Sequence, residues 1–143
     1  SVVIVSPYVS LFSKVGNFSA ELGGRYNHHT NFGENFTYSF NPSYRMKNDV
    51  KLFFNSSTGF KAPSLYQLYG QYGANPDLKP ERSFSNEIGA QWLSPNKKIE
   101  LRAVAFTRSI KDVIVYAYPT NLNLDKQNDQ GLELESTFTI RTK

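Results

Sequence analysis

Three tyrosines in one proline-rich stretch are the first residues whose chemistry and spacing suggest a binding role. Tyr66, Tyr69 and Tyr72 recur at every third position between Pro63 and Pro76. Each ring offers a flat apolar face and a polar hydroxyl, a combination that suits recognition of a small ligand. Large rings also pack loops against themselves or against a neighbouring loop, because burying them is favourable. A packed loop is therefore one interpretation, and ligand contact by the three rings is the other.

Two carboxylates could support acid–base chemistry. Glu133 and Glu135 alternate with apolar residues, so on a strand they share one face at a separation of roughly 6.5–7 Å. A carboxylate pair of that kind can hydrolyse a glycosidic bond. No other residue pattern supports catalysis, and no catalytic residue is predicted. An enzyme remains an alternative that depends on these two side chains alone.

Metal ligands are sparse. His28 and His29 are neighbours, which point to opposite faces of a strand and so do not easily share one ion. Asp125, Asn128 and Asp129 could offer oxygen ligands to Ca²⁺, although ordinary solvated loop polarity explains them as well. The sequence has no cysteine, which excludes disulfides and thiolate metal sites. No metal or cofactor is predicted.

Composition narrows the class of protein. The chain has 143 residues, a length typical of one domain, and its 39% hydrophobic and 15% aromatic content argues against intrinsic disorder. The net charge of +4 comes from scattered basic residues, so the sequence contains no cluster suited to nucleic acid. No apolar run approaches the roughly 18–20 residues that a membrane-spanning helix needs.

Period-two alternation of apolar and polar residues dominates the chain. Such alternation predicts strands with one apolar and one polar face. The expected strands fall at 3–14, 18–27, 36–45, 50–61, 83–92, 99–108 and 132–141. They are longer than ordinary strands of about 5–6 residues and match the roughly 9–11 residues of a strand that crosses a bilayer. We predict an all-β, antiparallel up-and-down meander of about seven long strands.

The expected connections alternate between short and long. Short turns are predicted at 15–17, 46–49 and 94–98, and longer loops at 29–35, 62–82 and 111–130. In a meander, alternate connections emerge on opposite rims, so one rim would carry every long loop. This asymmetry is typical of outer-membrane barrels.

Aromatic residues support a membrane barrel. Phe18, Tyr44 and Trp92 fall near the short-turn ends of their strands, and Tyr26, Phe36, Phe60 and Phe84 near the long-loop ends. Rings favour both interfaces of a bilayer, although they are also good strand formers. The apolar face would then meet lipid and the polar face a wet interior. Because a membrane sheet has to close, seven strands are expected to be part of a larger barrel.

Residues 58–87 carry a family resemblance. Gly59-Phe60-Lys61-Ala62-Pro63, Leu65-Tyr66-Gln67-Leu68-Tyr69-Gly70 and Asn75-Pro76-Asp77-Leu78-Lys79-Pro80-Glu81 resemble the barrel of TonB-dependent outer-membrane receptors, especially vitamin B12 receptors. Glu87 matches a glutamate of the following strand, and weaker similarity extends over nearly the whole chain. The extra Ala74 is a small departure from the family pattern.

The resemblance implies a bacterial outer-membrane transporter of a scarce nutrient such as a corrinoid or a ferric siderophore. Family members are 22-stranded barrels filled by a plug domain that contacts the TonB complex. Residues 1–143 would be a partial barrel without the plug domain and the closing strands, and not competent for transport alone. The nutrient is expected at the extracellular loops, and the choice of nutrient cannot be deduced from this sequence.

A soluble all-β carbohydrate- or ligand-binding module is the main alternative, favoured by the aromatic content. It predicts a monomer whose apolar face is buried against a second sheet. The barrel hypothesis predicts instead that Leu22, Phe40, Leu52 and Ile88 lie on the outside, and that the piece alone self-associates through its edge strands.

Overall fold

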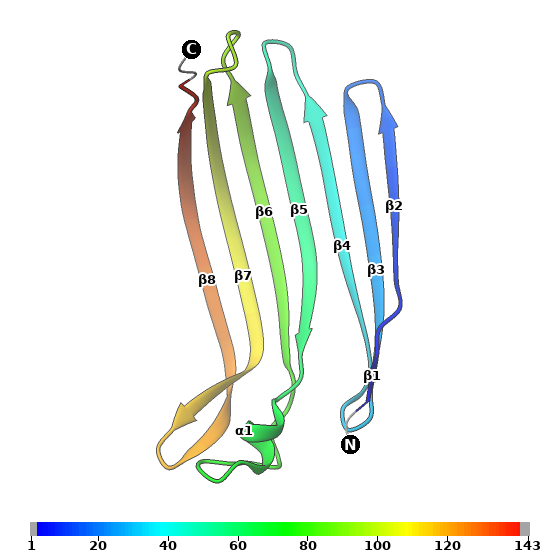
Figure 1. The fold of residues 1–143 in the computed structure, drawn as a ribbon, viewed down its shortest axis with the longest axis vertical. Helices are drawn as coiled ribbons and strands as arrows, with labels where there is room; N and C mark the ends of the chain where they lie inside the picture. The colour runs from blue at the N-terminus through cyan, green and yellow to red at the C-terminus, as the bar shows by residue number, and fades with distance from the viewer. Residues whose placement is uncertain (1–2, 141–143) are drawn as a thin grey trace.

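The protein is a single curved antiparallel sheet with one short helix at one end (Figure 1). The computed structural model describes residues 3–140. Its elements are β1 (Ile4–Val5), β2 (Tyr8–Val15), β3 (Phe18–His29), β4 (Gly33–Arg45), β5 (Val50–Lys61), α1 (Leu65–Tyr69), β6 (Glu81–Leu93), β7 (Ile99–Ala117) and β8 (Thr120–Phe138). No helix in this described part is long and apolar enough to cross a membrane.

The strands follow one another across the sheet in chain order, as predicted. β1 and β2 both pair with β3 and are separated by Pro7, which has no backbone N–H to donate. Together they occupy one position, so the sheet has seven neighbouring positions for its eight strands. The predicted antiparallel meander is confirmed.

One face of the sheet is apolar and open. Leu22 pairs with Phe40, and Leu52 with Ala90, on this face. Leu22, Phe40, Leu52 and Ile88 are 51%, 39%, 42% and 64% exposed. Among the described residues, the buried hydrophobic side chains are only Leu68, Leu78 and Val104. The apolar face is therefore not covered by a second layer, which removes the basis for a soluble sandwich.

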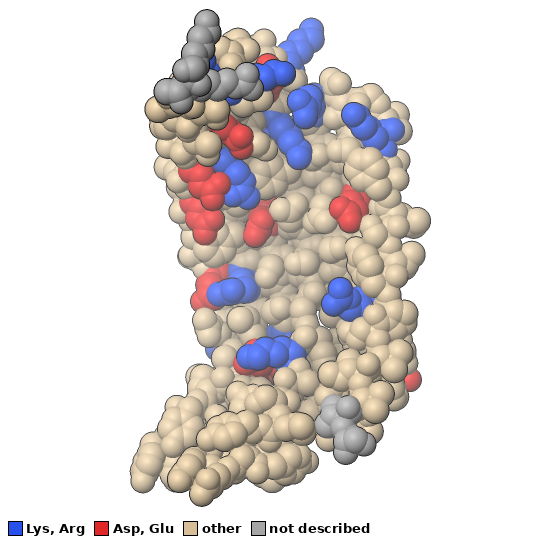
Figure 2. Space-filling model, viewed as in Figure 1, with Lys and Arg blue, Asp and Glu red and all other residues tan. Residues whose placement is uncertain are grey.

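The opposite face carries charged residues, and we call it the charged face (Figure 2). On it, Arg102 pairs with Glu135 at 3.2 Å and Arg108 with Asp129 at 2.7 Å, each across the β7–β8 ladder. Aromatic rings also lie here. A side chain added at Gly89 would collide with the Phe53 ring, so this glycine leaves the space that the ring fills.

Two belts of rings border the apolar face. Phe18 pairs directly with Tyr44 near the short-turn ends, and Tyr26 with Phe36 near the other ends. Phe18 and Tyr26 are eight residues apart on one strand, or roughly 26 Å at about 3.3 Å per residue. Before tilt shortens it, this spacing is comparable with the apolar band of about 25 Å on membrane barrels.

The strict alternation of short and long connections is wrong. β3 and β4 are joined by three residues, 30–32, and β7 and β8 by two, Tyr118 and Pro119. Only 62–80 is a long connection. It begins beside Pro63 and ends at Pro80, because a proline has no N–H to donate to a strand ladder. The expected loop at 111–130 is strand, because Val113 and Val115 pair with Leu124 and Leu122.

The β7–β8 hairpin is long and bent. Both strands have 19 residues, and β7 continues eight residues past Ser109, the partner of the belt residue Phe84. The ladder skips Asp112 and the opposite Asp125, and Asp112 has a φ of 55°. Aspartate tolerates this left-handed conformation better than most residues. The hairpin bends in this region (Figure 1), and hydrogen bonds join the part beyond the bend to the loop that follows α1.

Ile88 tests the assignment of the apolar face to lipid. It lies four residues from Phe84 and four from Trp92, midway between the belts. In the full-length protein, Ile88→Arg is expected to lower the free energy of unfolding from lipid vesicles by about 2–4 kcal/mol, because arginine then sits near the bilayer midplane. Denaturant unfolding measures this change. Ser85→Arg, on the charged face, is the control, and an equal loss in both variants would contradict the assignment.

Candidate ligand-binding rim

The loop with α1 and the tip of the β7–β8 hairpin form one substructure at the same end of the sheet (Figure 1). We call residues 62–80 and 113–124 the rim lobe. The segments are far apart in sequence, yet five hydrogen bonds from Asn75, Lys79, Asn121 and Asn123 join them.

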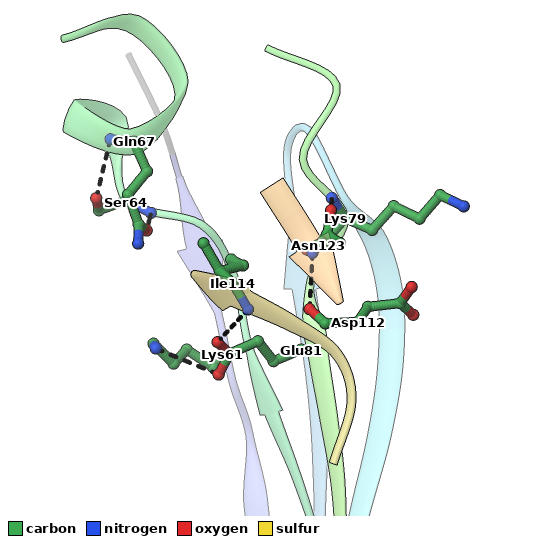
Figure 3. Close-up of polar contacts among 8 residues, drawn as sticks. All are labelled: Lys61, Ser64, Gln67, Lys79, Glu81, Asp112, Ile114 and Asn123. Carbon is green, nitrogen blue, oxygen red and sulfur yellow. Dashed lines mark hydrogen bonds and ion pairs between the residues drawn. The ribbon is translucent and has the colours of Figure 1, made fainter. Parts of the chain in front are cut away.

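Local chemistry explains why a helix forms directly after β5. Pro63 ends the strand, and Ser64 begins α1 with a reciprocal capping box. The Ser64 hydroxyl accepts a hydrogen bond from the Gln67 N–H at 3.2 Å, while the Gln67 side chain accepts one from the Ser64 N–H at 2.9 Å (Figure 3). At the other end, the Gly70 N–H donates to the Tyr66 carbonyl at 2.8 Å. Five residues are thereby held in a defined turn of helix.

The return of the loop is organised around Asn75. Its N–H donates to the Gln67 carbonyl at 2.9 Å, and its side-chain oxygen accepts from the Asp77 N–H at 3.0 Å. This second bond is the Asx turn expected where asparagine precedes a proline-containing turn. Leu68 and Leu78, 2% and 3% exposed, are the buried leucines of the loop.

Asn121 joins the loop to the hairpin. Its backbone N–H and its side-chain amide both donate to the Gly73 carbonyl, at 2.8 and 2.6 Å. Its own carbonyl accepts from the Asn75 amide at 2.9 Å. Asn121 is only 7% exposed, so water does not readily replace these partners. Gly73 has a φ of +65°, and a side chain there would collide with the Tyr116 ring at 2.5 Å.

Asn123 makes the second junction (Figure 3). Its side-chain oxygen accepts from the Lys79 N–H at 2.8 Å, and its amide donates to the Lys79 carbonyl at 2.9 Å and to the Asp112 carbonyl at 2.7 Å. One side chain therefore fixes both the returning loop and the bent part of β7.

Glu81 connects the lobe to the sheet. One carboxylate oxygen accepts from the Ile114 N–H at 2.8 Å, and the other is 3.2 Å from the Lys61 ammonium (Figure 3). The Glu81 side chain is 14% exposed and that of Lys61 is 65% exposed. The carboxylate thus links the end of β5, the start of β6 and the part of β7 beyond Asp112.

The predicted tyrosines point outward from this framework. Tyr66, Tyr69 and Tyr72 are 60%, 64% and 67% exposed, so the buried residues of the loop are Pro63, Leu68 and Leu78 and not the tyrosines. Two further rings that the sequence pattern did not indicate, Tyr116 and Tyr118, are 59% and 89% exposed at the hairpin tip. The alternation of 113–117 with 120–124 could have revealed them as part of a hairpin.

The other candidate residues are separated or already engaged. His28 is exposed, whereas His29 is buried and packs against Phe32 in a tilted arrangement with 4.9 Å between ring centroids, so the two imidazoles diverge. Asp125, Asn128 and Asp129 lie on β8 and not in a loop, and Asp129 is paired with Arg108. Glu133 lies opposite Val104, while Glu135 is paired with Arg102. Within residues 3–140, no group of three or more His, Asp or Glu side chains could hold a metal ion.

Taken together, the one-layer sheet, its exposed apolar face between aromatic belts and its polar opposite face define a segment of a membrane β-barrel. The charged face is the side that a barrel turns towards its interior. The rim lobe projects past one belt and therefore stands outside the membrane band.

Comparisons with known proteins agree. Residues 7–142 match the family model described as TonB dependent receptor-like, beta-barrel. The chain is 30% identical over 138 residues to the vitamin B12 transporter BtuB of Vibrio vulnificus (strain YJ016), which covers 92% of this chain and 22% of that protein. Its counterpart from Photobacterium profundum is 26% identical, with 92% and 23% covered.

Solved structures share the fold. The siderophore receptor PirA from Pseudomonas aeruginosa superposes with a TM-score of 0.85 at 25% identity, covering 93% of this chain and 28% of that one. The ferric enterobactin receptor PfeA of the same organism has a TM-score of 0.72 at 23% identity, with 90% and 24% covered.

The chain belongs to the family of TonB-dependent receptor β-barrels, which reside in the bacterial outer membrane. It spans less than a quarter of the length of the vitamin B12 transporters it matches.

The Asn121 junction gives a testable prediction. Asn121→Ala removes the hydrogen bond from the Asn121 side chain to the Gly73 carbonyl and keeps the two backbone bonds of residue 121, at a cost of about 0.5–1.5 kcal/mol. We expect residues 62–80 of the full-length protein to exchange backbone hydrogens roughly two- to tenfold faster, measured by mass spectrometry. Asn128→Ala, an exposed amide on the same strand, should leave that exchange unchanged. Unaltered exchange in the Asn121 variant would show that the junction does not hold the lobe.

Proposed function

We propose that this chain is part of an outer-membrane transporter that takes up a scarce nutrient, either a corrinoid or a ferric siderophore. Family membership over residues 7–142 carries the proposal, and both nutrient classes occur among the similar proteins, in the vitamin B12 transporters and the siderophore receptors. The receptors and transporters among its relatives, together with the ion pair that engages Glu135 of the candidate carboxylate pair, favour transport over catalysis.

The extracellular rim is the proposed place of first contact with the nutrient. Tyr66, Tyr69 and Tyr72 are the ligand-contacting residues in this proposal, since their rings are exposed on a lobe that hydrogen bonds hold in place. A preformed surface reduces the entropy lost on binding.

In this proposal, the barrel architecture implies three further partners: lipid, a plug domain and the TonB complex. The apolar face contacts outer-membrane lipid, and the charged face encloses a plug domain through which the TonB complex supplies energy. Residues 1–143 are one part of the barrel in this proposal. Nucleic acid is not a partner, because the Lys and Arg residues are dispersed over the charged face (Figure 2).

Uptake assays test the function. The full-length protein, placed in a bacterium that lacks its own B12 and siderophore receptors, is expected to restore growth limited by cobalamin or by iron, and only when TonB is present. Replacing Tyr66, Tyr69 and Tyr72 together by alanine should reduce uptake at limiting nutrient roughly tenfold or more, because stacking and hydroxyl contacts are lost.

The matched control is Tyr44→Ala, which removes a ring from the belt at the opposite end of the sheet. Uptake is normalised to receptor abundance in the outer membrane. Growth that is independent of TonB, or no growth with either nutrient, would contradict the proposed function.

A second experiment concerns the chain by itself. β8 pairs only with β7 in the described part of the chain, so it presents a long free edge. Produced alone, residues 1–143 are expected to self-associate or to require detergent, since long edges recruit further strands and the apolar face is uncovered. Sedimentation velocity measures this, and a compact monomer in plain buffer would oppose it.

A further inference from the structure

Three cations lie in register across the last three strands, just beyond one aromatic belt. Arg82 on β6 pairs with Lys111 on β7, and Lys111 pairs with Lys126 on β8. We call these three residues the cation row. All three are exposed. Directly opposite positions on neighbouring strands have Cβ atoms about 4.5–5.5 Å apart, so the three side chains share one small area of surface.

The cation row is on the apolar, outward-facing side of the sheet. Phe84 and Ile88 stand two and six residues after Arg82 on β6, so strand alternation places all three on the same face. The belt residue Phe84 pairs with Ser109, two residues before Lys111. The row therefore lies roughly 7 Å past the belt, at about 3.3 Å per residue. This is the level at which lipid headgroups border the acyl chains.

No member of the cation row forms an ion pair within residues 3–140. The ion pairs of this part of the chain are Lys61–Glu81, Arg102–Glu135 and Arg108–Asp129. Like charges directly opposite one another on neighbouring strands destabilise a sheet. The cation row contains two such pairs in succession, so an anion that lies against it relieves the repulsion.

The neighbouring acids do not neutralise the cation row. The Glu81 carboxylate, next to Arg82 in the chain, is bound on the charged face to the Lys61 ammonium and the Ile114 N–H. Asp112 and Asp125 lie one position beyond the row, where the β7–β8 ladder is interrupted, and neither is within ion-pair distance of it. An anion that approaches from outside the barrel therefore meets three unpaired cations.

Phosphate is the anion that this arrangement suits. Guanidinium and ammonium groups donate charge-assisted hydrogen bonds to phosphate oxygens. The row crosses three strands and so extends over roughly 10 Å, which leaves room for two phosphate groups side by side. The exposed Asp77 and Lys79 of the adjacent loop add one charge of each sign and do not change the balance.

We infer that the cation row binds the phosphate groups of an anionic lipid in the outer leaflet of the membrane. The acyl chains of that lipid lie along the adjoining apolar face, which is continuous with the row. This inference rests on the proposed placement in the outer membrane and is independent of the nutrient that is transported.

The experiment measures binding of diphosphoryl lipid A to the purified full-length receptor by native mass spectrometry, in detergent without divalent cations. Replacing Arg82, Lys111 and Lys126 together by glutamine is expected to weaken binding roughly a hundredfold, at about fivefold for each cation. Lys111→Gln alone should weaken it roughly fivefold and serves as a second, milder variant. Binding to the unmodified receptor should weaken as salt is added.

Two control variants separate the position of the charges from their number. Arg82→Lys, Lys111→Arg and Lys126→Arg together keep the charges and should keep the affinity. Lys47→Gln, Lys97→Gln and Lys98→Gln together remove three exposed cations from the short turns at the opposite end of the sheet, and should leave the affinity unchanged. Heat-modifiable migration in gel electrophoresis verifies that the barrel of each variant is folded.

The choice of lipid probe tests the phosphate contact. Monophosphoryl lipid A keeps the acyl chains and lacks one phosphate, so it should bind the unmodified receptor more weakly than the diphosphoryl form. The triple glutamine variant should bind the two forms nearly equally. Inorganic phosphate, which has no acyl chains, should not displace the lipid at millimolar concentration.

Undiminished binding to the triple glutamine variant, or an equal loss in the short-turn variant, overturns the inference. Displacement of the lipid by inorganic phosphate overturns it too, because the site would then recognise a free anion. TonB-dependent uptake, measured on the same variants, reports on the proposed function separately. A receptor that takes up its nutrient but binds lipid A without the cation row refutes this inference alone.

Discussion

Backbone hydrogen bonding within the sheet is the constraint on which the structure depends. In hydrocarbon, each unpaired N–H or C=O costs several kcal/mol, so a strand can cross a membrane only as part of a continuous ladder. The registers of β3 with β4 and of β5 through β8 provide such ladders, while β4 and β5 are joined over two shorter runs, at Ser39–Phe40 and at Ser43–Arg45. The period of two along these ladders assigns alternate residues to lipid and to the interior. The exposed Leu22 and Ile88 follow from this geometry and would be unfavourable in a water-soluble protein.

Much of this sheet could be predicted from local pattern. The alternation along 18–27 and 83–92 gave the correct faces, and Pro63 and Pro80 gave the correct limits of the long loop. Proline limits are reliable because they follow from covalent structure. The part of the β7–β8 hairpin beyond Asp112 was not predicted, because its local pattern is misleading. Pro119 and the asparagines of 120–124 resemble loop residues, and only pairing with a distant strand segment shows that they continue the sheet.

The rim lobe shows a similar division between local and long-range information. The capping box of Ser64 and Gln67 is a local signal, and so is the turn at Asn75. Asn121 and Asn123, in contrast, are ordinary polar residues in sequence. Their importance arises because the fold places the hairpin beside the loop, within hydrogen-bond distance of Gly73 and Lys79. Sequence spacing therefore identified three of the five exposed tyrosines but not the hydrogen bonds that hold their framework.

The strands of this segment end at unequal distances beyond the belt of rings. β3 ends three residues beyond Tyr26, whereas β7 continues eight residues beyond the partner of Phe84. The rim of the segment is therefore uneven, short at the β3–β4 turn and longer at the β7–β8 hairpin and the loop with α1 (Figure 1). Along this part of the wall, a solute that approaches over β3 and β4 meets a lower barrier than one that approaches from behind the β7–β8 hairpin.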